Sequence, residues 1–148
     1  MVDTFDVGLR LVVAALIGVA LGLNRDLHGR PTGVRTLGLV GLGAALIVLA
    51  VSRRDGAGMS RVIQGIVTGI GFIGAGVIIR HGSSERIQGL TTAACVWVTA
   101  CVGAACAITD WIVIVVGVPL IALILTFGGA LERAFHRLWP HRRTNDGS

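Results

Sequence analysis

One uncharged stretch, residues 62–79, constrains the fold of this chain more than any other segment. It contains no Asp, Glu, Lys or Arg, and it is long enough to cross the roughly 30 Å hydrocarbon core of a bilayer as a helix. Glycine disfavours helix in water, but in lipid every backbone N–H and C=O must be satisfied internally. A glycine-rich apolar segment therefore still becomes helical, and the stretch predicts a membrane-spanning helix.

The glycines of this predicted helix are expected to make it the centre of helix packing. At about 100° per residue, the helix carries a wide arc of small residues and a separate stripe of bulky ones, which is expected to face lipid. The small arc should let neighbouring backbones approach closely, because close packing drives helix association in membranes. It allows a homo-oligomer without requiring one. The packing residues are Gly65, Gly69, Gly71, Gly74 and Gly76, and the bulky stripe holds Ile66, Ile70, Ile73 and Val77.

A nucleotide-binding interpretation of the same stretch lacks the necessary context. Residues 69–74 match the dinucleotide fingerprint G-x-G-x-x-G by letter. That fingerprint needs a preceding strand and an acidic residue about 20 positions later. Here a connector with an arginine precedes it, and residues 91–95 read Thr-Thr-Ala-Ala-Cys. No nucleotide cofactor is expected.

The composition places the whole chain in the membrane class. Its 148 residues are 53% apolar, with a mean hydropathy of +0.81, which suits one membrane domain. The net charge of +5 comes from 13 arginines and no lysine, clustered between apolar segments and near the end. The bilayer is therefore the expected partner, rather than nucleic acid. The first apolar run lacks a small-residue cleavage site and is expected to be a retained span, not a signal peptide.

Five spans are predicted, at about residues 7–23, 36–51, 62–79, 88–107 and 111–127. Pro119 should kink the fifth span, and Gly128-Gly129 should end it. Apolar residues then recur at helical spacing from Leu131 to Trp139, which predicts a short amphipathic helix in the headgroup region. We expect an all-α polytopic helix bundle, with a transmembrane domain over 1–130 and a short amphipathic and disordered cytoplasmic tail over 131–148.

The distribution of arginine predicts the orientation of the spans. The N-terminal end and the second and fourth connectors hold four arginines, whereas the first and third connectors and the tail hold nine. Because cytoplasmic segments are rich in Arg and Lys, the N-terminus is expected outside and the C-terminus in the cytoplasm. Arg10, one turn inside the first span, is expected to reach the interface as an anchor.

With this topology, polar residues of three segments gather at the predicted cytoplasmic rim. Arginine guanidinium groups, and hydroxyl groups at the starts of helices, can bind phosphate or carboxylate groups of a lipid, a nucleotide or a partner protein. The alternative is that Arg25 and Arg35 only follow the positive-inside rule and pair with Asp26 and backbone carbonyls. The binding candidates are Arg25, Asp26, Arg35, Thr36, Gly89, Thr91 and Thr92.

The apolar cores lack the groups that cation transport or catalysis would require. No Asp or Glu falls inside them, and the notable polar residues are Gln64, Thr68 and Thr99, which could bond across helices. Metal-ligand spacing is absent from the cysteines and histidines. The cysteines, Cys95, Cys101 and Cys106, are expected to be small packing residues, and the histidines, His28, His81, His136 and His141, to be solvated. No enzymatic activity, cofactor or metal site is expected.

Three motifs, at residues 22–36, 64–78 and 88–97, occur in the order and with the residues of a known family. Together they resemble the MgtC/SapB family of bacterial inner-membrane proteins over roughly residues 8 to 125. The resemblance implies a link to magnesium homeostasis, growth at low Mg²⁺ and survival inside host cells. It also implies a regulator that binds partner membrane complexes such as ATP synthase. The alternative is a transporter or channel for Mg²⁺ or another small solute, as the family's customary label suggests.

Two departures from the family pattern limit what the resemblance implies. Asn24 stands where the family commonly has Glu, and Asp26 is expected to substitute for that carboxylate. Longer members carry a cytoplasmic regulatory domain after the fifth span, and functions that depend on it are not expected of the sequence given.

Overall fold

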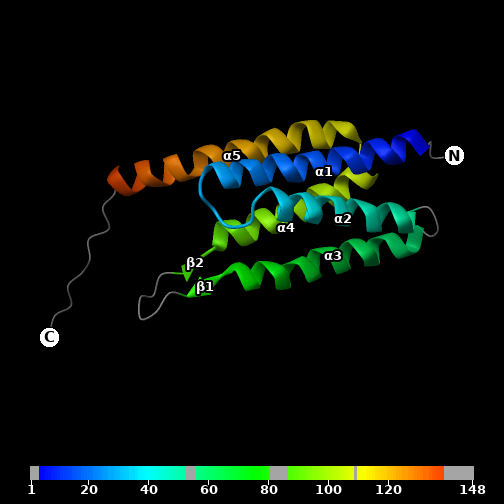
Figure 1. The fold of residues 1–148 in the computed structure, drawn as a ribbon, viewed down its shortest axis with the longest axis horizontal. Coiled ribbons are helices and arrows are strands. Elements are labelled where there is room, and N and C mark those ends of the chain that lie inside the picture. The colour runs from blue at the N-terminus through cyan, green and yellow to red at the C-terminus, as the bar shows by residue number, and fades with distance from the viewer. Residues whose placement is uncertain (1–3, 53–55, 81–86, 109, 139–148) are drawn as a thin grey trace.

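The computed structural model describes residues 4–52, 56–80, 87–108 and 110–138, and these form a bundle of long helices (Figure 1). The elements are α1 (Thr4–Leu27), α2 (Val34–Ser52), α3 (Gly56–Val77), β1 (Ile79–Arg80), β2 (Ile87–Gln88), α4 (Leu90–Ile108) and α5 (Trp111–Leu138). The two short strands pair antiparallel, with Ile79 opposite Gln88. Each of the five described helices is long and apolar enough to span a membrane. The predicted all-α fold with five membrane-spanning helices is confirmed.

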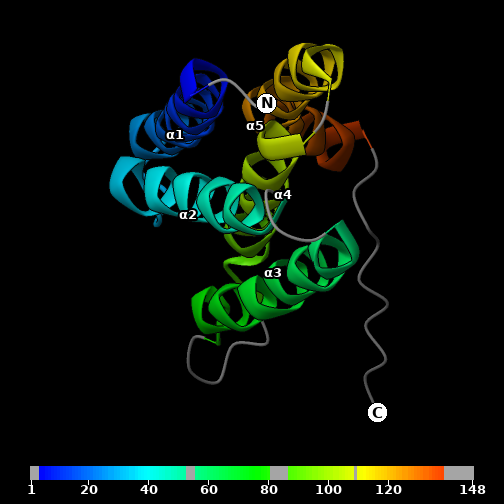
Figure 2. The same ribbon diagram turned by 90° about the vertical axis from the view of Figure 1, so that its right-hand side faces the viewer.

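The central helix of the bundle is α4. It contacts all four other helices. Half of the residues in its most apolar stretch are buried inside the protein, compared with 6% of the residues in the corresponding stretches of α3 and α5. The view along the bundle in Figure 2 shows α4 surrounded by its neighbours. Its many Ala, Gly, Cys and Thr residues permit close approach: a Cβ on Gly103 would overlap the carbonyl oxygen of Gly41 in α2 and lie 2.9 Å from its Cα.

Close glycine contacts also join α1 to α2. A Cβ on Gly18 would lie 2.9 Å from the carbonyl carbon of Leu37, and one on Gly22 would lie 2.6 Å from the Cα of Val34. Both distances are shorter than real Cβ contacts. The G-x-x-x-G pair of α1 is therefore a site where only glycine allows the two backbones to meet.

The prediction that the glycine-rich helix is the packing centre is wrong within a single chain. A Cβ on Gly65, Gly69, Gly71 or Gly76 would meet no atom within 4 Å, and Gly74 alone faces α4, where its Cβ would make an ordinary 3.5 Å contact with Ala93. Residues 69–74 lie inside continuous helix, without the strand that a dinucleotide site needs.

Two residues of the bulky stripe of α3, Ile66 and Ile70, face protein and not lipid as expected, whereas Ile73 is 49% exposed. Ile66 packs against a cluster that includes Val48 and Ala104, and Ile70 packs against one that includes Val96. Branched side chains fill the grooves beside the small residues of α4 and make more van der Waals contacts than a second small surface would. One helix with small residues is therefore enough for close packing.

The last helix is longer than predicted. It passes through Pro119, Gly128 and Gly129 without a break and ends at Leu138, so the expected end at Gly128-Gly129 is wrong. In a lipid environment an unbroken ladder of backbone hydrogen bonds is favoured, and two glycines do not end it. The predicted amphipathic segment over 131–138 forms the last turns of α5 and crosses the expected boundary at 130. Trp139 and the predicted tail to residue 148 lie outside the described residues.

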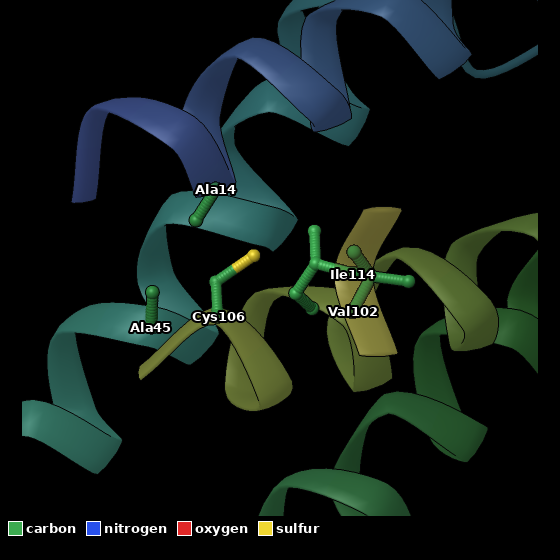
Figure 3. Close-up of a cluster of buried hydrophobic side chains, with 5 residues drawn as sticks. All are labelled: Ala14, Ala45, Val102, Cys106 and Ile114. Carbon is green, nitrogen blue, oxygen red and sulfur yellow. The ribbon is translucent and has the colours of Figure 1, made fainter. Parts of the chain in front are cut away.

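Part of the core consists of small side chains where four helices meet. Figure 3 shows Ala14 of α1, Ala45 of α2, Val102 and Cys106 of α4, and Ile114 of α5 turned toward one another. Cys106 and Cys95 are buried, whereas Cys101 is half-buried. The expected packing role of the cysteines is confirmed for the two buried ones.

Candidate functional site

The three motif segments converge at one end of the bundle. Figure 1 shows the end of α1, the start of α2, the β1–β2 pair and the start of α4 at this end. The binding candidates of the sequence lie here, and we call this end the rim. A hydrogen bond joins two of them, Arg25 and Thr92. Two others, Asp26 and Gly89, shape the backbone at the starts of α2 and α4.

Arg25, in the last turn of α1, is buried, with 5% of its surface exposed. Its guanidinium Nη2 donates a hydrogen bond to Oγ1 of Thr92, which is also buried, in the first turn of α4. The Nε atom of Arg25 is buried as well and has no hydrogen-bond partner among the described residues. The guanidinium therefore holds α1 against α4 and keeps unused donor capacity.

Asp26 does not pair with Arg25, contrary to the alternative prediction. Its Oδ2 accepts a hydrogen bond from the backbone N–H of Val34 at 3.1 Å and so caps the start of α2. A Cβ on Gly33 would overlap the same carboxylate, so a side chain at this position would displace the cap. Neighbouring residues on a helix point in different directions, which explains why Arg25 meets α4 while Asp26 meets α2.

Gly89 has a structural role at the rim. Its φ of +93° is in the left-handed region, and a Cβ there would lie 3.1 Å from the carbonyl carbon of Val77 at the end of α3. Its carbonyl accepts the N–H of Ala93 at 2.8 Å and begins α4. Glycine at this position lets the chain turn tightly between β2 and α4. The other candidates, Arg35, Thr36 and Thr91, are exposed.

A second polar cluster, which was not predicted from the sequence, lies at the opposite end of α4. Arg10 forms an ion pair with Asp6 at 2.8 Å, donates to the carbonyl of Cys106 at 2.9 Å, and lies 5.2 Å from the centre of the Trp111 ring. Arg10 is thus bound to protein groups of α1, α4 and α5, not only to the interface as expected. The four-residue spacing of Asp6 and Arg10 could have indicated the ion pair.

The intramembrane polar residues do not bond across helices as expected. Gln64 and Thr68 are exposed on α3, and Thr99 donates at 2.7 Å to the carbonyl of Cys95 in its own helix. An unexpected cross-helix bond joins Asn24 Nδ2 of α1 to Thr126 Oγ1 of α5 at 3.1 Å. No group of three His, Cys, Asp or Glu side chains that could hold a metal occurs in the described ranges.

Comparison with known proteins identifies the family. The sequence model of the MgtC family matches residues 11–134, most of the chain. The chain belongs to the MgtC family. Together with the five apolar helices, this membership makes it a multi-pass membrane protein of a magnesium-related family. No solved structure matches the chain.

Relatives within the MgtC family differ in length. The chain is 36% identical to "Protein SrpB" of Synechococcus elongatus over 88% of its own length and 79% of that protein. It is 41% identical to "Putative magnesium transporter YhiD" of Escherichia coli K12, over 64% of the chain and 47% of that protein. It is 42% identical to "Protein MgtC" of Salmonella typhimurium, over 66% of the chain and 42% of that protein. The matches thus cover less than half of the last two relatives.

Asn24 and Asp26 have separate contacts in this member of the MgtC family. Asp26, which was expected to substitute for a carboxylate at position 24, caps α2 instead. Asn24 faces Thr126, so position 24 contacts α5. The local structure does not support the expected substitution.

Proposed function

We propose that this MgtC-family protein is a non-enzymatic regulator in the bacterial inner membrane that acts by binding a partner membrane protein during adaptation to low Mg²⁺. The partner class that the resemblance implies is the membrane sector of ATP synthase. The observation that supports this function best is the open face of α3, defined by Gly65, Gly69, Gly71, Phe72 and Gly76.

The open face of α3 has the properties of a helix-binding surface in lipid. Its four glycines have no neighbouring atoms where a Cβ would stand, and Phe72 is 85% exposed. In a bilayer no hydrophobic force brings helices together, and association depends on close packing and hydrogen bonds. Exposed glycines allow the backbone of another helix to approach closely. Binding is therefore the activity that this surface supports.

The positions of the acidic groups favour binding over cation conduction. In the described part of the spans, Asp6 is paired with Arg10 near one end and Asp26 caps α2 at the other. A cation path through a membrane usually needs carboxylates or rings of carbonyls. The spans present neither arrangement within the described residues.

The alternative function is transport of Mg²⁺ or another small solute, which the printed name of the YhiD relative favours. On this hypothesis Gln64, Thr68 and the carbonyls beside Gly71 and Gly74 would line a path. Gln64, Thr68 and Gly71 are exposed on the outside of α3. Such a path would therefore have to form between α3 and a second subunit.

Site-specific photo-crosslinking in native membranes tests the binding function. A photoreactive residue replaces Phe72 on the open face, and a matched one replaces Leu16, a 60% exposed residue of α1. We expect a discrete protein adduct from position 72, identified by mass spectrometry, and only lipid adducts from position 16. Equal adduct patterns from the two positions would contradict a binding role for α3.

Liposomes that contain only the purified protein and an Mg²⁺-sensitive dye test the alternative. We expect no protein-dependent uptake from a preparation shown to be folded and inserted. Uptake that disappears in Gly71→Leu would replace the binding function with transport, because that change blocks only the open face.

A further inference from the structure

Two arginines of α1 meet opposite ends of α4. Arg10 donates to the carbonyl of Cys106 in the last part of α4, and Arg25 donates to Thr92 in the first turn. The C-terminal end of a helix carries partial negative charge and the N-terminal end partial positive charge. Arg10 is therefore electrostatically matched to its end of α4, whereas Arg25 adds a full positive charge to an end that is already positive.

Arg25 lacks a compensating negative group in the described part of the structure. The carboxylate next to it in sequence, Asp26, is directed to the N–H of Val34. Among the described residues, the only hydrogen bond of the guanidinium goes to a neutral hydroxyl, and Nε is buried without a partner. A buried charge normally has an opposite charge and a full set of hydrogen bonds. The environment of Arg25 thus has an excess of positive charge and of unused donors.

The first turn of α4 adds more donors at the same place. The first N–H groups of a helix have no acceptor within the helix and form a common binding site for anions. Thr92 is buried and brings its hydroxyl into this turn, whereas Leu90 and Thr91 are exposed, so the turn begins at the surface of the bundle. Guanidinium, hydroxyl and backbone N–H groups all donate hydrogen bonds to phosphate oxygens.

We propose that Arg25, Thr92 and the first turn of α4 form a binding site for a phosphate group. The group is carried either by the headgroup of an anionic lipid or by a soluble phosphate compound. The site lies at the ends of two membrane-spanning helices, the depth at which lipid phosphates occur. It is distinct from the open face of α3 and does not depend on the proposed partner.

The test uses the full chain, delipidated in a maltoside detergent that contains no phosphate. Native mass spectrometry measures binding of added phosphatidylglycerol. Thermal unfolding in the presence of inorganic phosphate measures binding of soluble phosphate, because a ligand raises the stability of the folded state that binds it. We expect wild type to bind at least one of the two probes. The probe that binds identifies the source of the phosphate, and wild type that binds neither overturns the proposal.

Variants separate this site from general attraction of anions to a basic end. Arg25→Gln should weaken binding of the active probe by about tenfold, as expected for loss of a charge-assisted contact. Arg30→Gln, which removes the same charge from the exposed loop nearby, should leave binding unchanged. Equal losses in both variants would show diffuse charge attraction and overturn the proposal.

Arg25 also holds α1 against α4, so Arg25→Gln could fail to fold. Thr92→Val keeps the shape and the charge of the site and removes one phosphate donor, and Arg25→Lys keeps the charge without the planar fork. We expect both to bind the probe more weakly than wild type at unchanged helix content. Wild-type binding in both folded variants would overturn the proposal.

Discussion

A single methyl group at Gly103 should disrupt the closest helix contact described in the bundle. In a Gly103→Ala protein the added Cβ would overlap the carbonyl oxygen of Gly41 and lie 2.9 Å from both the carbonyl carbon and the Cα of Gly41. These are backbone atoms of α2 and cannot move aside by a side-chain rotation. Since carbon atoms pack at about 3.5–4.0 Å, α2 and α4 would have to separate by roughly 1 Å.

The expected cost follows from that separation. Inserting a methylene-sized group into a well-packed core costs about 1–3 kcal/mol. Gly103→Ala belongs near the upper end, because the obstacle is rigid and the shift would loosen the buried neighbours Val102 and Ala104 as well. A loss of about 3 kcal/mol corresponds to roughly a hundredfold change in the unfolding equilibrium.

Reversible unfolding of the purified protein in mixed micelles, driven by dodecyl sulfate and followed by circular dichroism, measures this loss. The matched control is Gly69→Ala on α3, where a Cβ meets no atom within 4 Å. We expect the control to change the free energy of unfolding by less than about 0.5 kcal/mol. A Gly103→Ala protein as stable as wild type, or a control as damaging as Gly103→Ala, would refute α4 as the central helix.

Three further predictions concern polar groups at the ends of the helices. Asp26→Ala should cost about 1 kcal/mol of unfolding free energy because the start of α2 loses its cap, whereas Asp26→Asn should cost little; equal losses in the same assay would argue against capping. Arg10→Gln should cost about 1–2 kcal/mol, since the carbonyl of Cys106 and the ring of Trp111 both lose the guanidinium, and an unchanged stability would contradict these contacts. For orientation, Arg30→Cys should react with a membrane-impermeant maleimide only from the cytoplasmic side, and labelling in intact cells would reverse the predicted topology.

The positions of the helices could be predicted from the sequence because lipid imposes them. The second span was expected at 36–51 and is found at Val34–Ser52, and the fourth was expected at 88–107 and is found at Leu90–Ile108. Apolar length and interrupting polar connectors are enough for this result, since the backbone in a bilayer has few alternatives to helix. The end of α5 was wrong because Gly128-Gly129 acts as a helix end in water but not here.

The rotation of each helix about its axis could not be predicted in the same way. Both α3 and α4 present many small residues, and composition does not tell which of the two accepts neighbours on several sides. The answer depends on complementary shapes, such as Ile66 and Ile70 of α3 against the small residues of α4. Shape complementarity of this kind arises only when several helices are placed together.

The same limit applies to the two arginines of α1, which an arginine count assigns only to opposite sides of the membrane. Their different environments follow from the antiparallel pairing of α1 with α4. Arg10 meets Cys106 and Arg25 meets Thr92, so the contacts are 15 residues apart on α1 and 14 on α4. At 1.5 Å per residue these separations are about 22.5 Å and about 21 Å. One register therefore satisfies both contacts and places one arginine at each end of α4. Because the ends of α4 carry opposite partial charges, the carbonyl end of α4 adds to the stabilisation that Asp6 gives Arg10. The amide end gives Arg25 no such help, and an anion is the partner that would balance its charge.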